Sequence, residues 1–390
     1  MMRKVVVLAL GAFALGLDAY VMAGLLPVMA ADLGTSIAVI GQTVTAFTLA
    51  YAIAAPLFAT VLGAARSRTV LVLALAVFTV ANGLTAVLSS LPLLLLARVI
   101  AGAGAGLYAS QASVAAADLA PEQLRGRALG LVMGGMSAGT VLGVPLGVLL
   151  AEQAGWRSTM WLITALGAAV MIAVYGLLPS APAGRVVSAR QRLAVLVDRR
   201  IAVVALVSFL AAVASLGLYT YLAPVLADAG GVDAVTPYLW VWGVGGVLGS
   251  LAVGPLVDRL GRTAGLVAAI LGTLALTQLL LPFLAGAWAP AAALSLIVWG
   301  AAGWALQVPQ QQRLLHIGGE VRGPVAVAMN NSALYLGSAV GSAIGGAALA
   351  AGLSPSALPC AAGAASALAL LTHVLSGRRR SPVPAPDPGA

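Results

Sequence analysis

Residues 5–30 read VVVLALGAFALGLDAYVMAGLLPVMA, an apolar run with one carboxylate, Asp18, near its middle. A hydrocarbon layer about 30 Å thick is crossed by a helix of about 20 apolar residues, so this run is long enough to span a membrane. Met1-Met2-Arg3-Lys4 before it imitates a secretory signal, but the run exceeds a signal core of roughly 7–15 residues. The sequence therefore predicts a retained first membrane helix that carries a buried acid.

The rest of the chain has a similar composition. Its 390 residues are 61% hydrophobic and only 8% charged, with a mean hydropathy of +1.05. Such a chain cannot present a soluble surface, which excludes the soluble classes of protein. Twelve spans of about 20 residues with short turns use the whole length and leave no room for a domain outside the membrane.

Apolar runs separated by short polar segments predict an all-α integral membrane protein with twelve transmembrane helices. We expect them at 5–30, 39–63, 69–90, 92–117, 124–151, 157–178, 200–226, 236–257, 264–284, 288–312, 324–351 and 355–376. The polar stretch 179–199 is the predicted linker between two six-helix bundles, 1–178 and 200–376. Residues 377–390, rich in proline, are predicted to be a disordered cytoplasmic tail.

The basic residues indicate the orientation of these helices. With the N-terminus in the cytoplasm, 18 of the 20 Lys and Arg residues fall on the inner side, whereas Arg157 falls outside and Arg98 lies within a span. This positive-inside bias predicts that both termini are cytoplasmic. Because the charges are spread over many loops, they favour anionic membrane lipid as a partner and argue against nucleic-acid binding. Aromatic residues near the predicted outer ends are expected to anchor the helices at the interface: Trp156, Tyr238, Trp240, Trp242 and Trp288.

The two halves repeat one another. Gly139, Gly143 and Gly147 recur as Gly337, Gly341 and Gly345 at an offset of 198, and Arg68-Thr69 recurs as Arg262-Thr263 at 194. Membrane transporters use such duplicated bundles to form a central site between two bodies that rock against each other.

Asp18 and Arg98 are full charges deep in the predicted spans. At about 1.5 Å per residue, Asp18 lies roughly 20 Å from the inner boundary, and Arg98, in a helix of opposite direction, lies at a similar depth. The two side chains can therefore meet. We predict that Asp18 exchanges protons while Arg98 tunes the exchange. A permanent structural ion pair is the alternative.

Polar and aromatic side chains at helical spacing predict a substrate cavity, because such a face must look inward in lipid. The candidates are Tyr20, Tyr219, Tyr221, Trp304, Gln307, Gln311, Asn331 and Tyr335. They suit a moderately apolar ligand held by few hydrogen bonds. Interhelical packing is the alternative role of each residue.

Signs of enzyme or metal chemistry are few. One cysteine and two histidines supply too few ligands for a metal site, and no nucleotide-binding loop or catalytic motif occurs. We expect a protein that is not an enzyme, needs no cofactor and is driven by a proton gradient.

Several stretches resemble the twelve-span drug:proton antiporters of the major facilitator superfamily. Gly16 to Pro27 is similar to the first helices of bacterial sugar, purine and chloramphenicol exporters, and Arg98 to Gly104 resembles the family's fourth-helix motif with a proton-coupling arginine. Gly139, Gly143, Pro145 and Gly147 look like its antiporter and gating motif, although Pro145 does not directly follow a glycine.

The segment from Gly254 to Arg262 matches the superfamily's loop signature G-x-L-x-D-R-x-G-R. The resemblance implies a cytoplasmic gate at this loop, built from Asp258, Arg259, Gly261 and Arg262, with Arg125 and Arg127 as partners from the first half. The first-half copy of the loop has Ala64 where the acid is expected, so Asp258 is predicted to supply the main gate contact.

These patterns together predict a proton-coupled exporter in the cytoplasmic membrane, with a complete pathway in each monomer. The internal acid and base sum to zero charge, which favours a small neutral or monocationic amphiphile, such as an antibiotic, as substrate. The alternatives are an exporter of a sugar or nucleoside, an uncoupled carrier, and a non-transporting membrane scaffold or sensor.

Overall fold

The computed structural model describes residues 2–61, 66–121, 124–179, 195, 197–232, 234–260, 263–288 and 290–378. These residues form helices and short connections, without a strand among them. The helices are α1 (Met2–Asp32), α2 (Ile37–Val61), α3 (Ser67–Val87), α4 (Leu91–Leu119), α5 (Arg125–Ala138), the π-helix η2 (Gly139–Gly143), α6 (Val144–Ala154), α7 (Trp156–Leu177), α9 (Arg199–Thr220), α10 (Leu222–Gly230), α11 (Thr236–Leu260), α12 (Thr263–Ala287), α13 (Ala291–Ala305), α14 (Gln307–Ala350), the 3₁₀ turn η3 (Pro355–Ala357) and α15 (Leu358–Arg378).

Twelve segments in the described ranges are long and apolar enough to cross a membrane, which confirms the predicted number of spans. The tenth span runs from Ala291 to Gly319 and is therefore longer than the predicted 288–312. It joins the eleventh span at Gly319. The φ of this residue is +61°, which glycine adopts without strain and other residues do not. The predicted linker and tail lie largely outside the described residues, which omit 180–194, 196 and 379–390.

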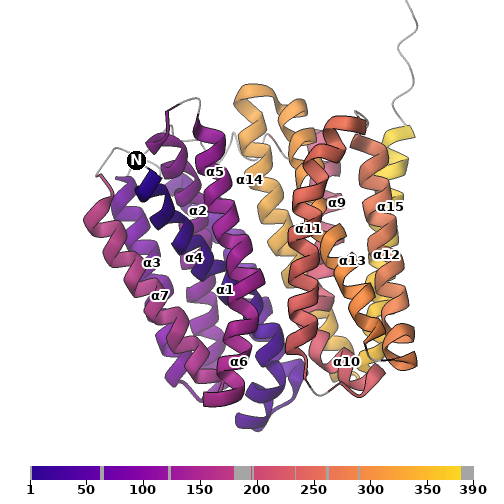
Figure 1. Cartoon of the computed structure of the whole chain (residues 1–390). Helices are drawn as coiled ribbons and strands as arrows, with labels where there is room; N and C mark the ends of the chain where they lie inside the picture. Colours follow the sequence, from indigo (N-terminus) through magenta and orange to yellow (C-terminus); the bar gives the residue numbers. More distant parts are fainter. Residues whose placement is uncertain are drawn as a thin grey trace, which may run out of the picture.

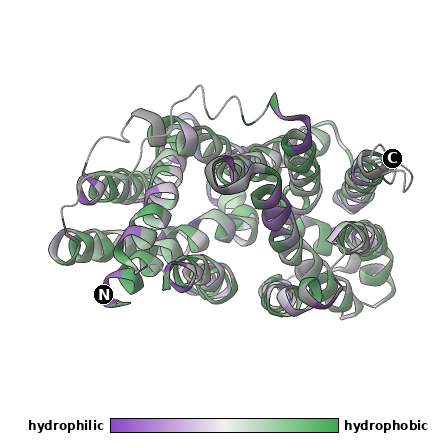
Figure 2. Ribbon diagram, turned by 90° about the horizontal axis from the view of Figure 1, so that it is seen from above, coloured by the Kyte–Doolittle hydropathy of each residue, from purple (hydrophilic) through white to green (hydrophobic). Residues whose placement is uncertain are grey.

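The helices form two bundles side by side, α1 to α7 and α9 to α15 (Figure 1). Both the start of α1 and the end of α15 lie at the same end of the molecule, at the top of Figure 1, which we call the terminal end. The opposite end, with α6 and α10, is the distal end. Hydrophobic residues dominate both bundles when the molecule is seen from above, along the helices (Figure 2), as expected for helices in contact with lipid.

Prolines interrupt two of the spans. The fifth span, predicted as one helix over 124–151, contains the π-helix η2 just before Pro145, a residue that lacks the N–H needed by the carbonyl four residues earlier. The seventh span, predicted over 200–226, ends as α9 at Thr220 and restarts as α10 after Tyr221. Pro224 removes the N–H that would have bonded the carbonyl of Thr220, which explains the break.

Glycine stripes pack the first helix of each bundle against the fifth. A Cβ at Gly139 would collide with the backbone of Phe13 in α1, and one at Gly341 would collide with the backbone of Val213 in α9. The repeated glycines therefore serve close backbone approach in both halves, as small residues do in membrane bundles.

Each bundle also joins its first and last helices at the distal end through an aspartate. Asp32 accepts hydrogen bonds from Trp156 Nε1 (3.0 Å) and from Arg157. Asp228, at an offset of 196, accepts from the Ser354 hydroxyl and from the amide of Ser356 (3.0 Å). These hydrogen bonds, led by that of Ser354, hold the pKa of the Asp228 carboxyl below its ordinary value. The pairs confirm the internal duplication at the level of contacts.

The two bundles meet mainly through α2 and α14. The ring of Tyr51 stacks on Tyr335 with centroids 3.7 Å apart, and Thr45 Oγ1 hydrogen-bonds to Ser342 Oγ at 2.8 Å, closer to the distal end. At the distal end itself, Thr236 Oγ1 donates to Glu152 Oε1 (2.8 Å). These contacts join the halves in the middle and at the distal end.

Candidate functional site

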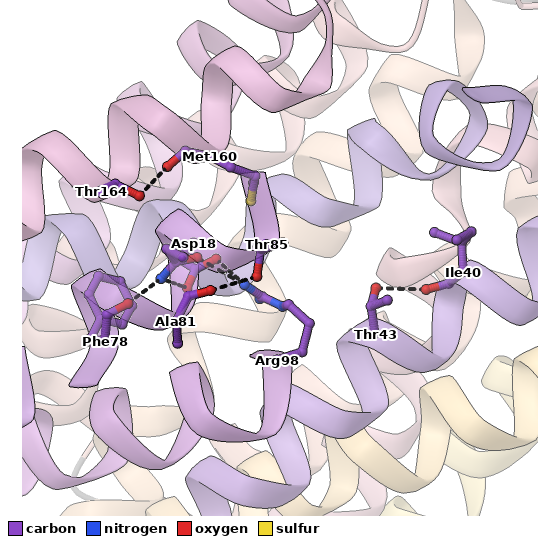
Figure 3. A network of polar contacts seen from close by, with 10 residues as sticks. Asp18, Ile40, Thr43, Phe78, Ala81, Thr85, Arg98, Met160 and Thr164 are labelled. Carbon is purple, nitrogen blue, oxygen red and sulfur yellow. Dashed lines mark hydrogen bonds and ion pairs between the residues drawn. The ribbon is translucent and has the colours of Figure 1, made fainter. Parts of the chain in front are cut away.

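The predicted charges meet inside the first bundle. Arg98 Nη1 of α4 donates to Asp18 Oδ1 of α1 at 2.7 Å, and the two side chains point toward one another in Figure 3. They are 1% and 0% exposed. A charge-assisted hydrogen bond of this length offsets much of the cost of burying both ions, which would be prohibitive for either ion alone.

Asn82 of α3 completes the site, and the sequence patterns did not single it out. Its Nδ2 donates to Asp18 Oδ2 (3.1 Å) and to the carbonyl of Phe78 (3.0 Å), while its Oδ1 accepts from Arg98 Nη1 (3.2 Å). The amide is fully buried. Because a carboxylate can only accept and a guanidinium can only donate, this orientation of the amide is the one that satisfies both neighbours.

The guanidinium has further contact with an aromatic face. Arg98 Cζ lies 4.4 Å from the centroid of the Phe47 ring in α2. Such a cation–π contact stabilises a buried cation without adding a counter-charge. Arg98 Nε has no hydrogen-bond partner in the part of the chain that the structure describes. Arg98 therefore relies on Asp18, Asn82 and Phe47.

The second bundle also carries a neutral amide at the position that corresponds to Asn82. Gln278 of α12 follows Asn82 at the offset of 196 and is also fully buried; its Oε1 accepts from Ser366 (2.7 Å). In the same bundle, Trp299 Nε1 donates to Ser215 Oγ of α9 at 2.7 Å. Both halves thus bury hydrogen-bonded polar side chains, but the buried ion pair of the described residues belongs to the first half.

A small cavity lies between the two bundles. Its lining comes from α1, α2, α9 and α14: Ala19, Tyr20, Ala23, Val44, Thr48, Leu216, Tyr219, Thr220, Tyr335 and Ser338. Tyr20 is two positions after Asp18, and Thr48 directly follows Phe47, so α1 and α2 each touch the ion pair on one side and the cavity on the other. The predicted cavity residues Tyr20, Tyr219 and Tyr335 are brought together here.

Aromatic rings surround this cavity. Tyr20 packs edge-on against Tyr219 with centroids 5.8 Å apart, and it lies 6.4 Å from the ring of Trp304. Trp242 of α11 joins them, 4.3 Å from Tyr219 and 6.2 Å from Trp299. We call Tyr20, Tyr219, Trp242 and Trp304 the aromatic cluster.

The expected role of Trp242 as an interfacial anchor is wrong. The residue is 1% exposed, within the aromatic cluster, and its Nε1 has no hydrogen-bond partner among the described residues. Trp156 is also buried, whereas Trp288 is 68% exposed and fits the anchor role. A position near the predicted outer end of a span did not reveal which face of the helix Trp242 occupies.

Other predicted cavity residues lie apart from the cavity lining. Tyr221 is fully buried between α2 and α14, where its hydroxyl donates to the carbonyl of Ser342 at 2.8 Å, so its described role is packing. Gln307, Gln311 and Asn331 are half-buried on α14 and are not among the residues that line the cavity.

The antiporter-motif residues Gly139, Gly143, Pro145 and Gly147 are buried against α1 and α7. They lie at the π-helix and in the turn that follows it, where the fifth span packs against the helix of Asp18. Thr159 Oγ1 of α7 donates to the carbonyl of Gly147 at 2.5 Å and thereby ties the fifth span to α7.

The predicted gate is only partly within the described residues. Arg125 and Arg127 are exposed in the first turn of α5, and Arg259 is exposed near the end of α11. Gly261, Arg262 and the side chain of Asp258 lie outside the described part, so the gate contact stays a prediction.

Twelve spans in two repeated bundles, with a cavity between them and a buried ion pair beside it, define a membrane carrier. Residues 8–342 match the family model of the Major Facilitator Superfamily. The chain belongs to this superfamily of transporters; it is a multi-pass cell-membrane protein that carries a small molecule, and it is not an enzyme.

Curated relatives support the assignment along the whole chain. The chain is 32% identical to the inner membrane transport protein YdhP of Escherichia coli K12 over 375 residues, which cover 96% of this chain and 95% of that protein. It is 33% identical to a chloramphenicol resistance protein of Streptomyces lividans over 261 residues, or 65% of this chain and 66% of that protein.

Solved structures share the fold at low identity. A bacterial homologue of the human lysosomal transporter Spinster, in an inward-facing and unoccupied conformation, superposes with a TM-score of 0.77 at 16% identity, over 98% of this chain and 99% of that chain. The human organic anion transporter MFSD10 gives 0.68 at 19% identity, over 95% and 99%. Both confirm the expected fold.

Proposed function

We propose that the protein is a proton-coupled exporter of a small neutral or monocationic amphiphile. The observation that carries the proposal is the pair of Asp18 and Arg98, buried beside a cavity between the bundles and linked to it through α1 and α2. A membrane-embedded carboxylate is costly to maintain, which favours a role in moving protons.

The coupling step follows from electrostatics. Proton binding neutralises Asp18 and removes the counter-charge of Arg98, so the 2.7 Å contact loses its main attraction. Because Tyr20 is two positions after Asp18 on α1, a shift of α1 changes the cavity. Exchange follows if the proton binds from outside as substrate leaves, and is released inside before the next substrate binds.

The terminal end is proposed to face the cytoplasm, in accordance with the positive-inside bias. Contacts between the halves lie in the middle and at the distal end, as in the hydrogen bond of Thr236 to Glu152. Among described residues, nothing lies within 4 Å of a Cβ built at Gly126, Gly130 or Gly134 near the terminal end of α5. This arrangement supports a carrier closed outward and ready to accept substrate from the cytoplasm.

The substrate class follows from the cavity wall. The rings of Tyr20, Tyr219 and Tyr335 and the aliphatic side chains beside them make this wall mostly apolar, with hydroxyl groups as the polar contacts. The ion pair carries no net charge, which disfavours dications and polyanions. The similarity to a chloramphenicol resistance protein supports hydrophobic antibiotics as first candidates.

Inverted membrane vesicles test the function. They are energised until a pH-sensitive dye is quenched, and neutral or monocationic antibiotics, chloramphenicol among them, are then added. We expect some compounds to dequench the dye in wild-type vesicles and to fail in Asp18→Asn vesicles that contain equal amounts of protein. Transport that keeps its full pH dependence in Asp18→Asn would contradict the proposal.

A further inference from the structure

We propose that Asn82 is the third member of the proton-exchange site: its amide and the carboxyl group of Asp18 are interchangeable partners of Arg98. This inference rests on the proposed function and assigns a positioning role to a residue that carries no charge. It is drawn from the closed triangle of hydrogen bonds among the three side chains.

The triangle has a defined chemistry at each contact. Asn82 donates through Nδ2 to Asp18 and accepts through Oδ1 from Arg98, at 3.1 and 3.2 Å. The same amide is fixed to its own helix by the bond from Nδ2 to the Phe78 carbonyl. Its position therefore does not depend on the charge of Asp18, because the backbone bond persists when the carboxylate is neutralised.

Protonation of Asp18 leaves a buried cation. Arg98 then keeps two supports that carry no counter-charge, Asn82 Oδ1 and the ring of Phe47. Since Arg98 Nε already has no partner among the described residues, the Asn82 contact is a large share of what remains. Asn82 thus stabilises the guanidinium in the protonated state and makes that state accessible.

No other described charge contacts the triangle. The helices that contact α1 are α2, α4 to α7, α9 and α10, and α3 contributes Asn82. The other charged residues described on these helices and on α1 lie at or near helix ends: Arg3, Lys4, Asp32, Arg68, Asp118, Arg125, Arg127, Glu152, Arg157, Arg199, Arg200 and Asp228. Among the described residues, the pair and the amide are therefore the groups that set proton binding at Asp18.

The alternative is that Asn82 merely ties α3 to α1 and α4. A purely structural amide would lower the amount of folded protein when replaced, but it would not move a titration. The isosteric change Asn82→Asp separates the roles, because it keeps the shape and adds a second carboxyl group next to Arg98.

The test titrates the infrared band of protonated carboxyl groups in purified full-length protein, a readout that needs no substrate. We expect the band to contain a component that titrates in the wild type, is lost in Asp18→Asn and returns in the double variant Asp18→Asn/Asn82→Asp, while the components of the other acidic residues stay unchanged. In Asn82→Asp alone, two carboxyl groups share one guanidinium, so the first proton binds at a pH higher by about one unit or more.

The matched control is Gln278→Glu, the same amide-to-acid change at the corresponding buried position of the second bundle. It lies away from Arg98 and should leave the wild-type band in place. A second variant, Asn82→Ala, avoids a new buried charge; because it removes both the donor to Asp18 and the acceptor for Arg98, its band should titrate at a pH different from that of the wild type.

An unchanged midpoint in Asn82→Asp or in Asn82→Ala would overturn the proposal. So would a double variant without a titrating band. Transport that keeps its pH dependence in Asp18→Asn would instead contradict the proposed function, and the carboxyl band tests Asn82 in either case.

Discussion

The buried Trp242 indole has no hydrogen-bond partner among the described residues, which leaves its N–H donor free where the two bundles meet. A buried polar group without a partner is costly, and a ligand acceptor would remove that cost. The hydroxyl groups of Tyr20 and Tyr219 belong to the same aromatic cluster. We therefore expect the substrate to combine an aromatic or aliphatic body with a hydrogen-bond acceptor.

The change Trp242→Phe keeps the ring and removes the N–H. The loss of one hydrogen bond of about 1 kcal/mol should raise the KM of an exported compound about fivefold. The matched control is Trp288→Phe, since Trp288 is exposed and far from the cluster in sequence, and it should leave the KM unchanged. Equal KM values for wild type and Trp242→Phe would remove Trp242 from the substrate site.

The pairing of Asp18 with Arg98 was predictable from their charges, because an ion in an apolar span needs a partner of opposite charge and these two lie at similar depth. Asn82 was missed because a single amide in an apolar run carries no comparable signal. The repeat offset of 196, which pairs Asn82 with Gln278, was the pattern that could have found it. Trp242 was misplaced because its face on α11 depends on tertiary packing.

At the scale of helices, the glycine stripe of the fifth span fixes its distance from α1. A Cβ at Gly139 meets the backbone of Phe13 and cannot be accommodated by a side-chain rotation. We expect Gly139→Ala to destabilise the purified protein by about 1–3 kcal/mol, seen as a lower Tm in detergent. Gly130→Ala is the control, since no described atom lies within 4 Å of its Cβ. Similar Tm values for both variants would contradict close packing as the role of Gly139.

The number and positions of the spans were predictable from hydropathy, but their interruptions were only partly so. Pro145 and Pro224 mark where a helix loses a hydrogen bond. The sequence does not predict whether a π-helix forms at such a point, as at Gly139–Gly143, or whether the helix breaks, as at Tyr221. That choice depends on how each segment packs against its neighbours.

For the whole molecule, the proposed function requires the two bundles to separate at the distal end when substrate leaves. Thr45 Oγ1 and Ser342 Oγ, 2.8 Å apart, belong to different bundles. In a Cys360→Ser background, the pair Thr45→Cys and Ser342→Cys should form a disulfide that stops export, and a reductant should restore it. Export that continues with the disulfide formed would contradict opening at this end.

The control pair is Asp228→Cys and Ser354→Cys, which joins two contacting residues within one bundle at the same end. Its disulfide should leave export active, because the pair moves as one body. The two-bundle architecture itself was predictable from the repeats, whereas the contacts between the bundles at the distal end were not, since all conformations of a carrier share one sequence.

The exchange of a proton for substrate is tested most directly in liposomes that contain the purified protein and a compound that dequenches the dye in vesicles. A pH gradient is imposed, acidic inside. The compound is then added outside, at the same concentration for the wild type and the variant. We predict that wild-type protein accumulates the compound inside above the outer concentration, while Asp18→Asn only equilibrates it. Equal accumulation by both proteins, or none by the wild type, would contradict proton exchange at Asp18.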